Sequence, residues 1–255
     1  MLMRTLTLST VAALAALPAL AQDDGTERTL AIFAHPDDEL FVAPALARAA
    51  REGEGFTLVY ATSGDQGPGV SNLERGGELA KRREGEALCA AEALGIKSVR
   101  FLRLGDGTLG VNAHHPGSSA ITLTKELKAM LENEQFSTVV TWGPDGGYGH
   151  SDHRMVSVLT TQLVQAMDED RPTLIFPGIR KGTLPPVPEM QFWAESDPEL
   201  LDLAPAYDAE DLQAATKAAQ CHETQFDAET RAGMMTLFDQ SIWQGSVHFR
   251  RALKD

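Results

Sequence analysis

Short, almost wholly apolar runs alternate along the chain with longer segments in which apolar residues recur every three to four positions. The short runs are typical of buried β-strands, and the longer periodic segments are typical of amphipathic helices. This β-α-β-α order predicts an α/β fold, a parallel sheet flanked by helices within a single domain. The predicted strands are 29–34, 56–62, 99–102, 137–142 and 173–176, and the predicted helices are 40–52, 74–94, 122–135, 152–167, 209–222 and 228–237.

The alternation stops at residues 177–207, which hold six of the 13 prolines and no long periodic segment. A connection of this length inside a compact domain is usually functional. We expect an insertion, an additional pair of antiparallel strands or a lid. Trp193 is the candidate substrate contact within it.

The first 21 residues have the parts of a secretory signal peptide. Arg4 supplies the positive start, residues 6–20 form the apolar stretch, and an A-x-A cleavage site ends at Ala21. We therefore expect cleavage after Ala21, a mature domain over residues 22–255 without a membrane span, and a periplasmic or secreted location. An uncleaved N-terminal anchor is the alternative.

The net charge and the number of cysteines exclude some classes of function. The chain has 22 Lys+Arg and 36 Asp+Glu, a formal net charge of −14, so a nucleic-acid partner is not expected. Cys89 and Cys221 are the only two cysteines, too few for a disulfide scaffold or a cysteine-rich zinc module. They either pair in an oxidising compartment or remain free thiols. The sequence does not determine the oligomeric state.

Polar and glycine-rich clusters follow four of the predicted strands, at 35–39, 63–67, 105–107 and 143–153. The carboxyl ends of parallel strands form one edge of a sheet, and ligands bind in the crevice at that edge. The four clusters are therefore expected to converge on one site.

The first and last clusters carry complementary metal chemistry. His35 and Asp38 lie three residues apart at a strand-to-helix turn, and His153 begins the helix after the fourth strand. Two imidazoles and one carboxylate with an open position are typical of a catalytic zinc centre. Asp37 is then left as a general base for the metal-activated water, and His150 is placed to act on the oxyanion or the leaving amine.

Other assignments remain open for these residues. Asp152 is a candidate for orienting one of the imidazoles. The same two-histidine, one-carboxylate set also suits non-haem iron. The chain has no G-x-G-x-x-G after its first strand, no P-loop and no G-x-S-x-G, so nucleotide and serine-nucleophile sites are not predicted.

Two motifs resemble those of the PIG-L/LmbE family of zinc-dependent N-deacetylases. AHPDDE at 34–39 follows the first strand, and HSDH at 150–153 comes later in the same order. Residues 83–95 are similar to the R-x-x-E…LG helix of the family, 105–107 to its DG turn, and 217–225 to its late K…H-x-[ST]-Q segment.

The resemblance implies a Rossmann-like, LmbE-like fold without a nucleotide, and a bound zinc ion that iron or cobalt could replace. It implies that Arg83 and Asp106 hold substrate hydroxyls and that Tyr148 assists the transition state from a mobile loop. It implies the same core site as the residues themselves do: His35, Asp38 and His153 as metal ligands, Asp37 as general base, and His150 as oxyanion stabiliser and proton donor to the amine.

Family members mostly remove acetyl groups from N-acetylglucosaminyl units, so we expect a zinc-dependent N-deacetylase acting on a small amino-sugar substrate. Residues 144–150 are particularly similar to the mycothiol-pathway branch. Thiol-cofactor synthesis is cytoplasmic, whereas the expected signal peptide implies export, so we expect a cell-envelope or imported N-acetylated sugar. The alternatives are a metal-dependent esterase or O-deacetylase, a non-catalytic envelope protein that binds sugar or metal, and an iron oxygenase.

Overall fold

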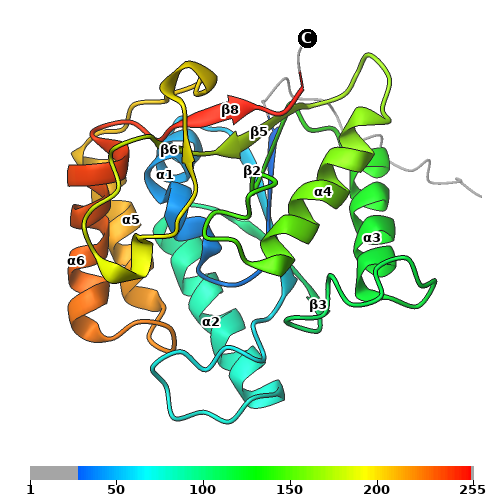
Figure 1. Ribbon diagram of the computed structural model, residues 1–255, viewed down its shortest axis with the longest axis horizontal. Coiled ribbons are helices and arrows are strands. Elements are labelled where there is room, and N and C mark those ends of the chain that lie inside the picture. Colours follow the sequence, from blue (N-terminus) through cyan, green and yellow to red (C-terminus); the bar gives the residue numbers. More distant parts are fainter. Residues whose placement is uncertain (1–27, 254–255) are drawn as a thin grey trace, which may run out of the picture.

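The computed structural model describes residues 28–253, in which a six-stranded sheet is covered by helices (Figure 1). The strand order is β3-β2-β1-β4-β5-β8, with β1 to β5 parallel and β8 antiparallel at one edge. The predicted single-domain α/β fold is confirmed. The strands of this sheet are β1 Arg28–Phe33, β2 Gly55–Thr62, β3 Ser98–Leu104, β4 Thr138–Thr141, β5 Thr173–Pro177 and β8 Phe249–Arg251.

Alternate residues of the central strands face two different layers of helices. Leu30 and Ile32 of β1 lie in one buried cluster with α3 and α4, whereas Ala31 and Phe33 pack against α1, α2, α5 and α6. Both faces are covered, which is why the strands read as continuous apolar runs. No helix within 28–253 is long and apolar enough to cross a membrane. The helices are α1 Ala43–Arg51, α2 Gly77–Ala93, α3 Ser119–Asn133, α4 Ser151–Gln165, α5 Ala209–Cys221 and α6 Ala228–Phe238, with a π-helical turn η4 at Asp239–Trp243.

The structure departs from the predicted elements at β8 and at the start of α1. β8 was not predicted, because its three residues are too few to show an alternation; Ile175 of β5 lies opposite Arg251 of β8. The helix predicted from residue 40 begins instead with a 3₁₀ turn, η1 Asp38–Val42, and α1 follows. Pro44 lacks the N–H that an α-helix would direct to the carbonyl of Leu40, so the two turns cannot form one continuous ladder.

The proline-rich segment lies against the loop after β4. It contains a short parallel pair, β6 Ile179–Arg180 with β7 Glu195–Ser196, so the expectation of an antiparallel pair is wrong. The N–H of Ala194 donates to the carbonyl of Gly147 at 2.8 Å, which joins the segment to the loop that carries Tyr148. Two 3₁₀ turns complete it, η2 Pro188–Met190 and η3 Pro198–Leu200.

The two cysteines form a disulfide. Cys89 of α2 and Cys221 at the end of α5 have Cα atoms 5.8 Å apart and a bonded pair of sulfurs. The free-thiol alternative is therefore wrong. The bond ties α5, and the residues directly after it, to a helix on the same face of the sheet.

Candidate active site and metal centre

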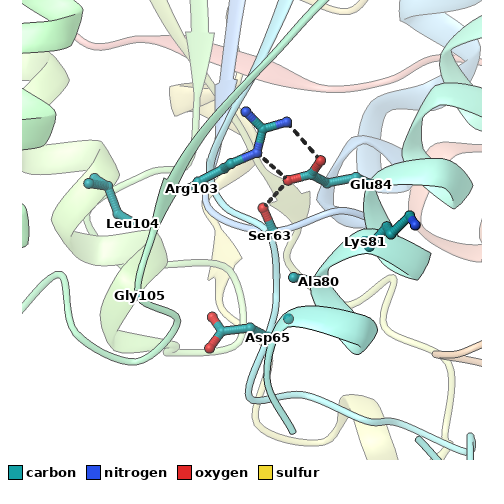
Figure 2. Close-up of a pocket in the computed structure, with 9 residues that line it drawn as sticks. Ser63, Asp65, Ala80, Lys81, Glu84, Arg103, Leu104 and Gly105 are labelled. Carbon is teal, nitrogen blue, oxygen red and sulfur yellow. Dashed lines mark hydrogen bonds and ion pairs between the residues drawn. The ribbon is translucent and has the colours of Figure 1, made fainter.

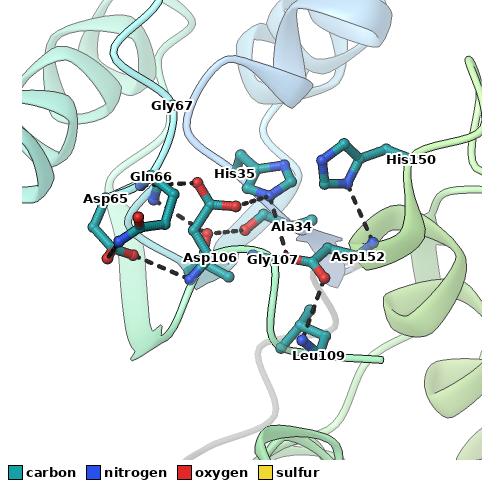
Figure 3. A network of polar contacts seen from close by, with 12 residues as sticks. Ala34, His35, Asp65, Gln66, Gly67, Asp106, Gly107, Leu109, His150 and Asp152 are labelled. Atoms are coloured by element: carbon teal, nitrogen blue, oxygen red, sulfur yellow. Dashed lines mark hydrogen bonds and ion pairs between the residues drawn. The ribbon is translucent and has the colours of Figure 1, made fainter. Parts of the chain in front are cut away.

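Loops from the carboxyl ends of four strands meet at one edge of the sheet (Figure 3). His35 Nε2, after β1, lies 3.0 Å from Asp106 Oδ1, after β3. The other carboxylate oxygen of Asp106 accepts the N–H of Gln66, after β2, at 3.1 Å. His35 Nδ1 lies 3.2 Å from Nε2 of His153, near the start of α4. The predicted convergence of the polar clusters is confirmed.

The three residues expected to bind metal lie together. Asp38 Oδ1 is 3.1 Å from His153 Nε2, and Asp38 Oδ2 is 3.9 Å from His35 Nδ1. All three side chains are buried. His150 stands beside them, since His35, His150 and His153 offer ring nitrogens within 4.8 Å of one another.

The carboxylate of Asp38 is held by donors from three directions. Its Oδ2 accepts the backbone N–H groups of Ala34 and His35, each at 3.0 Å, and the indole N–H of Trp142 at 3.1 Å. Apart from its position at the end of a predicted strand, no pattern pointed to Trp142. The tryptophan orients the carboxylate from the wall of the site.

His153 is fixed with one nitrogen directed into the centre. Its Nδ1 lies 3.1 Å from the carbonyl of Gly146, which can only accept, so Nδ1 carries the proton and Nε2 is the free ligand atom. The Trp142 ring stacks on the imidazole at 4.5 Å between centroids. Gly147 has a φ of +69°, and a Cβ there would lie 2.7 Å from the Trp142 ring, so the chain needs glycine at this point.

The charges of the centre suit a cation. Burial alone would lower the pKa of His35, but hydrogen bonds to Asp106 and Asp152, together with the charge of Asp38, raise it to about 10. Burial alone would raise the pKa of Asp38, but His153 and His35 hold it well below its ordinary value. The neighbouring carboxylates therefore stabilise positive charge at this point. This donor set fits a divalent metal.

Asp106 and Asp152 both face the outer nitrogen of His35. Asp152 Oδ2 lies 3.6 Å from His35 Nε2, and its carboxylate also accepts the N–H groups of Gly107 and Leu109. Asp152 therefore has the position expected of an orienting residue. Asp106 Oδ1 lies 3.0 Å from the same nitrogen, and its expected contact with a substrate hydroxyl stays a prediction. With these two acids on Nε2, Nδ1 of His35 is the atom that faces Asp38 and His153.

The backbone of Asp37 has a left-handed conformation that L-residues seldom adopt. Its φ is +102°, and its backbone N–H donates to Glu39 Oε2 at 3.0 Å. Its carboxylate lies 3.4 Å from Arg83 Nη2. Burial raises the pKa of Asp37 to about 6, even though the charge of Arg83 opposes the rise. A pKa near neutrality suits a general base.

Arg83 has loop carbonyls as its main partners. It is only 3% exposed, and its guanidinium donates to the carbonyls of Pro36, Gly64 and Gly67. A Cβ at Gly64, which has a φ of +66°, would lie 2.1 Å from Arg83 Nη1. Arg83 thus fastens the loops after β1 and β2, and its contact with a substrate hydroxyl stays a prediction.

His150 and Tyr148 stand at the open side of the centre. His150 Nδ1 accepts the N–H of Asp152 at 3.2 Å, so the proton of the neutral ring is on Nε2. Burial, and then the neighbouring histidines, lower the pKa of His150 and favour that neutral form. Tyr148 is 47% exposed, and its ring lies 5.0 Å from that of His153 and 5.9 Å from that of Trp193. Burial raises the pKa of Tyr148, so its hydroxyl remains a donor.

A separate cavity of about 390 Å³ lies between α2 and the end of β3 (Figure 2). In the wall of this cavity, the carboxylate of Glu84 accepts hydrogen bonds from the hydroxyl of Ser63, at 2.6 Å, and from the guanidinium of Arg103. None of the expected metal ligands or catalytic residues lines it. Its lining is Ser63, Asp65, Gly77, Ala80, Lys81, Glu84, Arg103, Leu104 and Gly105.

Known proteins resemble the chain in sequence and in fold. A 1D-myo-inositol 2-acetamido-2-deoxy-alpha-D-glucopyranoside deacetylase of Thermobifida fusca is 36% identical over 163 residues, which are 57% of each chain. An enzyme of the same name from Mycobacteroides abscessus is 29% identical over 84% of each chain. The chain spans about half the length of most curated relatives that it matches.

The structure is similar to that of N,N'-diacetylchitobiose deacetylase from Pyrococcus horikoshii. The TM-score is 0.64 at 19% sequence identity, over 88% of this chain and 83% of the other. At this identity the likeness concerns the fold, and it confirms the LmbE-like architecture that the motifs implied.

The predicted periplasmic or secreted location is wrong. The curated relatives are enzymes of the mycothiol pathway, and that pathway is cytoplasmic. The signal peptide expected at residues 1–21 lies outside the described residues. The expectation of a cell-envelope or imported sugar rested on export and loses its support.

A family model extends across the strands and loops that build the metal centre. This model, described as PIG-L: GlcNAc-PI de-N-acetylase, matches residues 30–164, more than half of the chain. The matched region contains the expected metal ligands and catalytic residues, from His35 to His153, whereas Trp193 lies beyond it. The chain belongs to the PIG-L family.

Proposed function

We propose that this protein is a zinc-dependent hydrolase that removes the acetyl group from an N-acetylglucosamine conjugate. The observation that carries the proposal is the buried cluster of His35, Asp38 and His153 with a further carboxylate, Asp37, beside it. PIG-L deacetylases depend on a metal. A pure binding site has no need of a carboxylate with a pKa near 6 next to the ligands.

We assign the metal to His35 Nδ1, one oxygen of Asp38, and His153 Nε2. Zinc held there would lower the pKa of a water molecule and polarise the acetyl carbonyl. Asp106 and Asp152 keep His35 in the required orientation through Nε2, and the carbonyl of Gly146 does the same for His153 through Nδ1. Iron and cobalt are alternative metals for this ligand set.

Asp37, His150 and Tyr148 carry out the proton transfers and the stabilisation of charge in the proposed reaction. Asp37 accepts the proton of the attacking water, and Arg83 favours the ionised form of Asp37 through its charge. The Nε2–H of His150 and the hydroxyl of Tyr148 donate hydrogen bonds to the oxygen on which negative charge develops. His150 then gives its Nε2 proton to the leaving amine as the C–N bond breaks, and it regains a proton from Asp37, which had taken one from the water. The products are the free amine and acetic acid, which ionises to acetate.

The proposed substrate class follows the named relatives, whose substrate is N-acetylglucosamine joined to inositol. The ring of Tyr148, about half exposed beside the centre, suits the apolar face of a sugar. Trp193, whose ring contacts those of Tyr148 and Phe41, supports this wall.

Amine release from the inositol conjugate, from free N-acetylglucosamine and from N-acetylated chito-oligosaccharides tests the proposal. The zinc-loaded protein is compared with Asp37→Asn, expected to retain zinc and to lose about 10²-fold or more in kcat. Asp202→Asn, which changes a surface acid paired with Arg251, is the matched control. Acetate release from O-acetyl sugars without amine release would point to an esterase. Full activity in Asp37→Asn would refute the assignment of the base.

A further inference from the structure

Five residues at the end of α5 and directly after it, Cys221–Gln225, are fastened to α2 and to the loop after β2. We call them the 221–225 segment. Cys221 is bonded to Cys89 of α2, and both the N–H and the hydroxyl of Thr224 donate to Glu86 of α2, at 2.9 and 2.6 Å. Gln225 Nε2 donates to the carbonyl of Gly67, in the loop after β2, at 3.0 Å. The segment is thus anchored independently of the metal centre.

His222 is the residue of this segment that points toward the site. Its Nε2 lies 2.6 Å from Glu39 Oε1, and both side chains are fully buried. Its Nδ1 is buried without a hydrogen-bond partner among the described residues. A buried polar atom without a partner is costly, so the contact with Glu39 accounts for the presence of an imidazole here.

Glu39 connects His222 to the turn of Asp37. Its second oxygen, Oε2, accepts the hydroxyl of Tyr60 at 2.7 Å and the backbone N–H of Asp37 at 3.0 Å. Asp37 has the φ of +102°, a conformation that persists only where the surroundings impose it. The hydrogen bond from the Asp37 N–H to Glu39 contributes to holding this conformation, and His222 contacts the other oxygen of the same carboxylate.

We propose that His222 is a positioning residue which, through Glu39, holds the Asp37 turn in the geometry that its carboxylate needs to act as base. The inference rests on the proposed function for the role of Asp37. It adds to the residues that serve the reaction one that lies 183 positions from Glu39 and whose hydrogen bond goes to Glu39 rather than to an expected metal ligand.

Two amide substitutions separate positioning from simple packing. His222→Gln places its amide nitrogen near the position of Nε2 and preserves the donor to Glu39, whereas the shorter His222→Asn does not reach it. We expect His222→Asn to lower kcat by about tenfold or more with KM and zinc content unchanged, and His222→Gln to recover most of the loss. Thr224→Val is the control, because it removes a buried hydrogen bond of the same segment and leaves Glu39 untouched.

A second measurement applies to the folded protein without substrate. Hydrogen exchange of the Asp37 amide should be faster in His222→Asn than in His222→Gln, because the acceptor Glu39 is released only in the former. Equal kcat values for the two amide variants, or an equal loss in Thr224→Val, would overturn the inference while the wild-type protein stays active. An inactive wild-type protein would instead refute the proposed function, and the exchange rates would still decide whether His222 acts on the Asp37 turn.

Discussion

Trp142→Phe tests how much the wall of the site contributes to metal binding. The indole N–H donates to Asp38 Oδ2 at 3.1 Å, and the ring stacks on His153. Phenylalanine keeps an aromatic ring against the imidazole but removes the donor. The variant therefore isolates one hydrogen bond to a carboxylate that we assign to the metal.

The expected loss follows from the charge and burial of this hydrogen bond. Trp142 is 3% exposed, so water cannot take the place of the lost N–H. A hydrogen bond to a charged group is worth about 1.5–3 kcal/mol, and a partner that orients a metal ligand is worth roughly 10–100-fold in affinity. We therefore expect zinc to bind Trp142→Phe about 10–100-fold more weakly.

Competition with a chromogenic chelator would measure the zinc Kd of both proteins. Trp243→Phe is the matched control, because Trp243 is 2% exposed and its indole donates to the neutral carbonyl of Phe41. It should lose stability without a comparable change in Kd. An unchanged zinc Kd in Trp142→Phe, or an equal change in both variants, would refute the reasoning that Asp38 is an oriented ligand.

Three other predictions concern the reaction and the stability of the fold. The kcat/KM of the zinc-loaded enzyme should fall as pH drops through about 6, because protonated Asp37 cannot accept a proton; a rate that stays constant down to pH 5 would place the base elsewhere. Tyr148→Phe should lower kcat by roughly 10–100-fold with unchanged zinc content, since it removes only a donor at the open side; an unaltered kcat in steady-state assays would exclude that role. Cys89→Ser should lower the free energy of unfolding by about 3–5 kcal/mol, because the disulfide closes a loop with a sequence separation of 132; urea titration of both proteins with and without reductant checks it, and equal midpoints would contradict it.

Much of the architecture could be read from local pattern. Five parallel strands were predicted from apolar runs, because burial on both faces makes such strands almost wholly hydrophobic. β8 was missed because it has only three residues, and Pro44 divided a helix that periodicity alone had joined. Export was predicted from the N-terminal pattern, and this prediction is contradicted by relatives that belong to a cytoplasmic pathway. A short apolar stretch carries no information about the pathway in which an enzyme acts.

By itself, the sequence determined which residues would gather at the site. His35, Asp37, Asp38, His150 and His153 follow two strands that end at the same edge of a parallel sheet, so topology alone brings them together. Only the tertiary structure decided the partner of each side chain. It turned Asp106 toward His35, buried Arg83 among loop carbonyls and set Trp142 on Asp38. It also joined Cys89 to Cys221 and His222 to Glu39. These contacts join residues from 16 to 183 positions apart, with Arg83 and Gly67 at the near end and His222 and Glu39 at the far end. They depend on how α2 and α5 pack against the sheet, and apolar periodicity specifies which face of a helix is buried but not which polar groups meet across it.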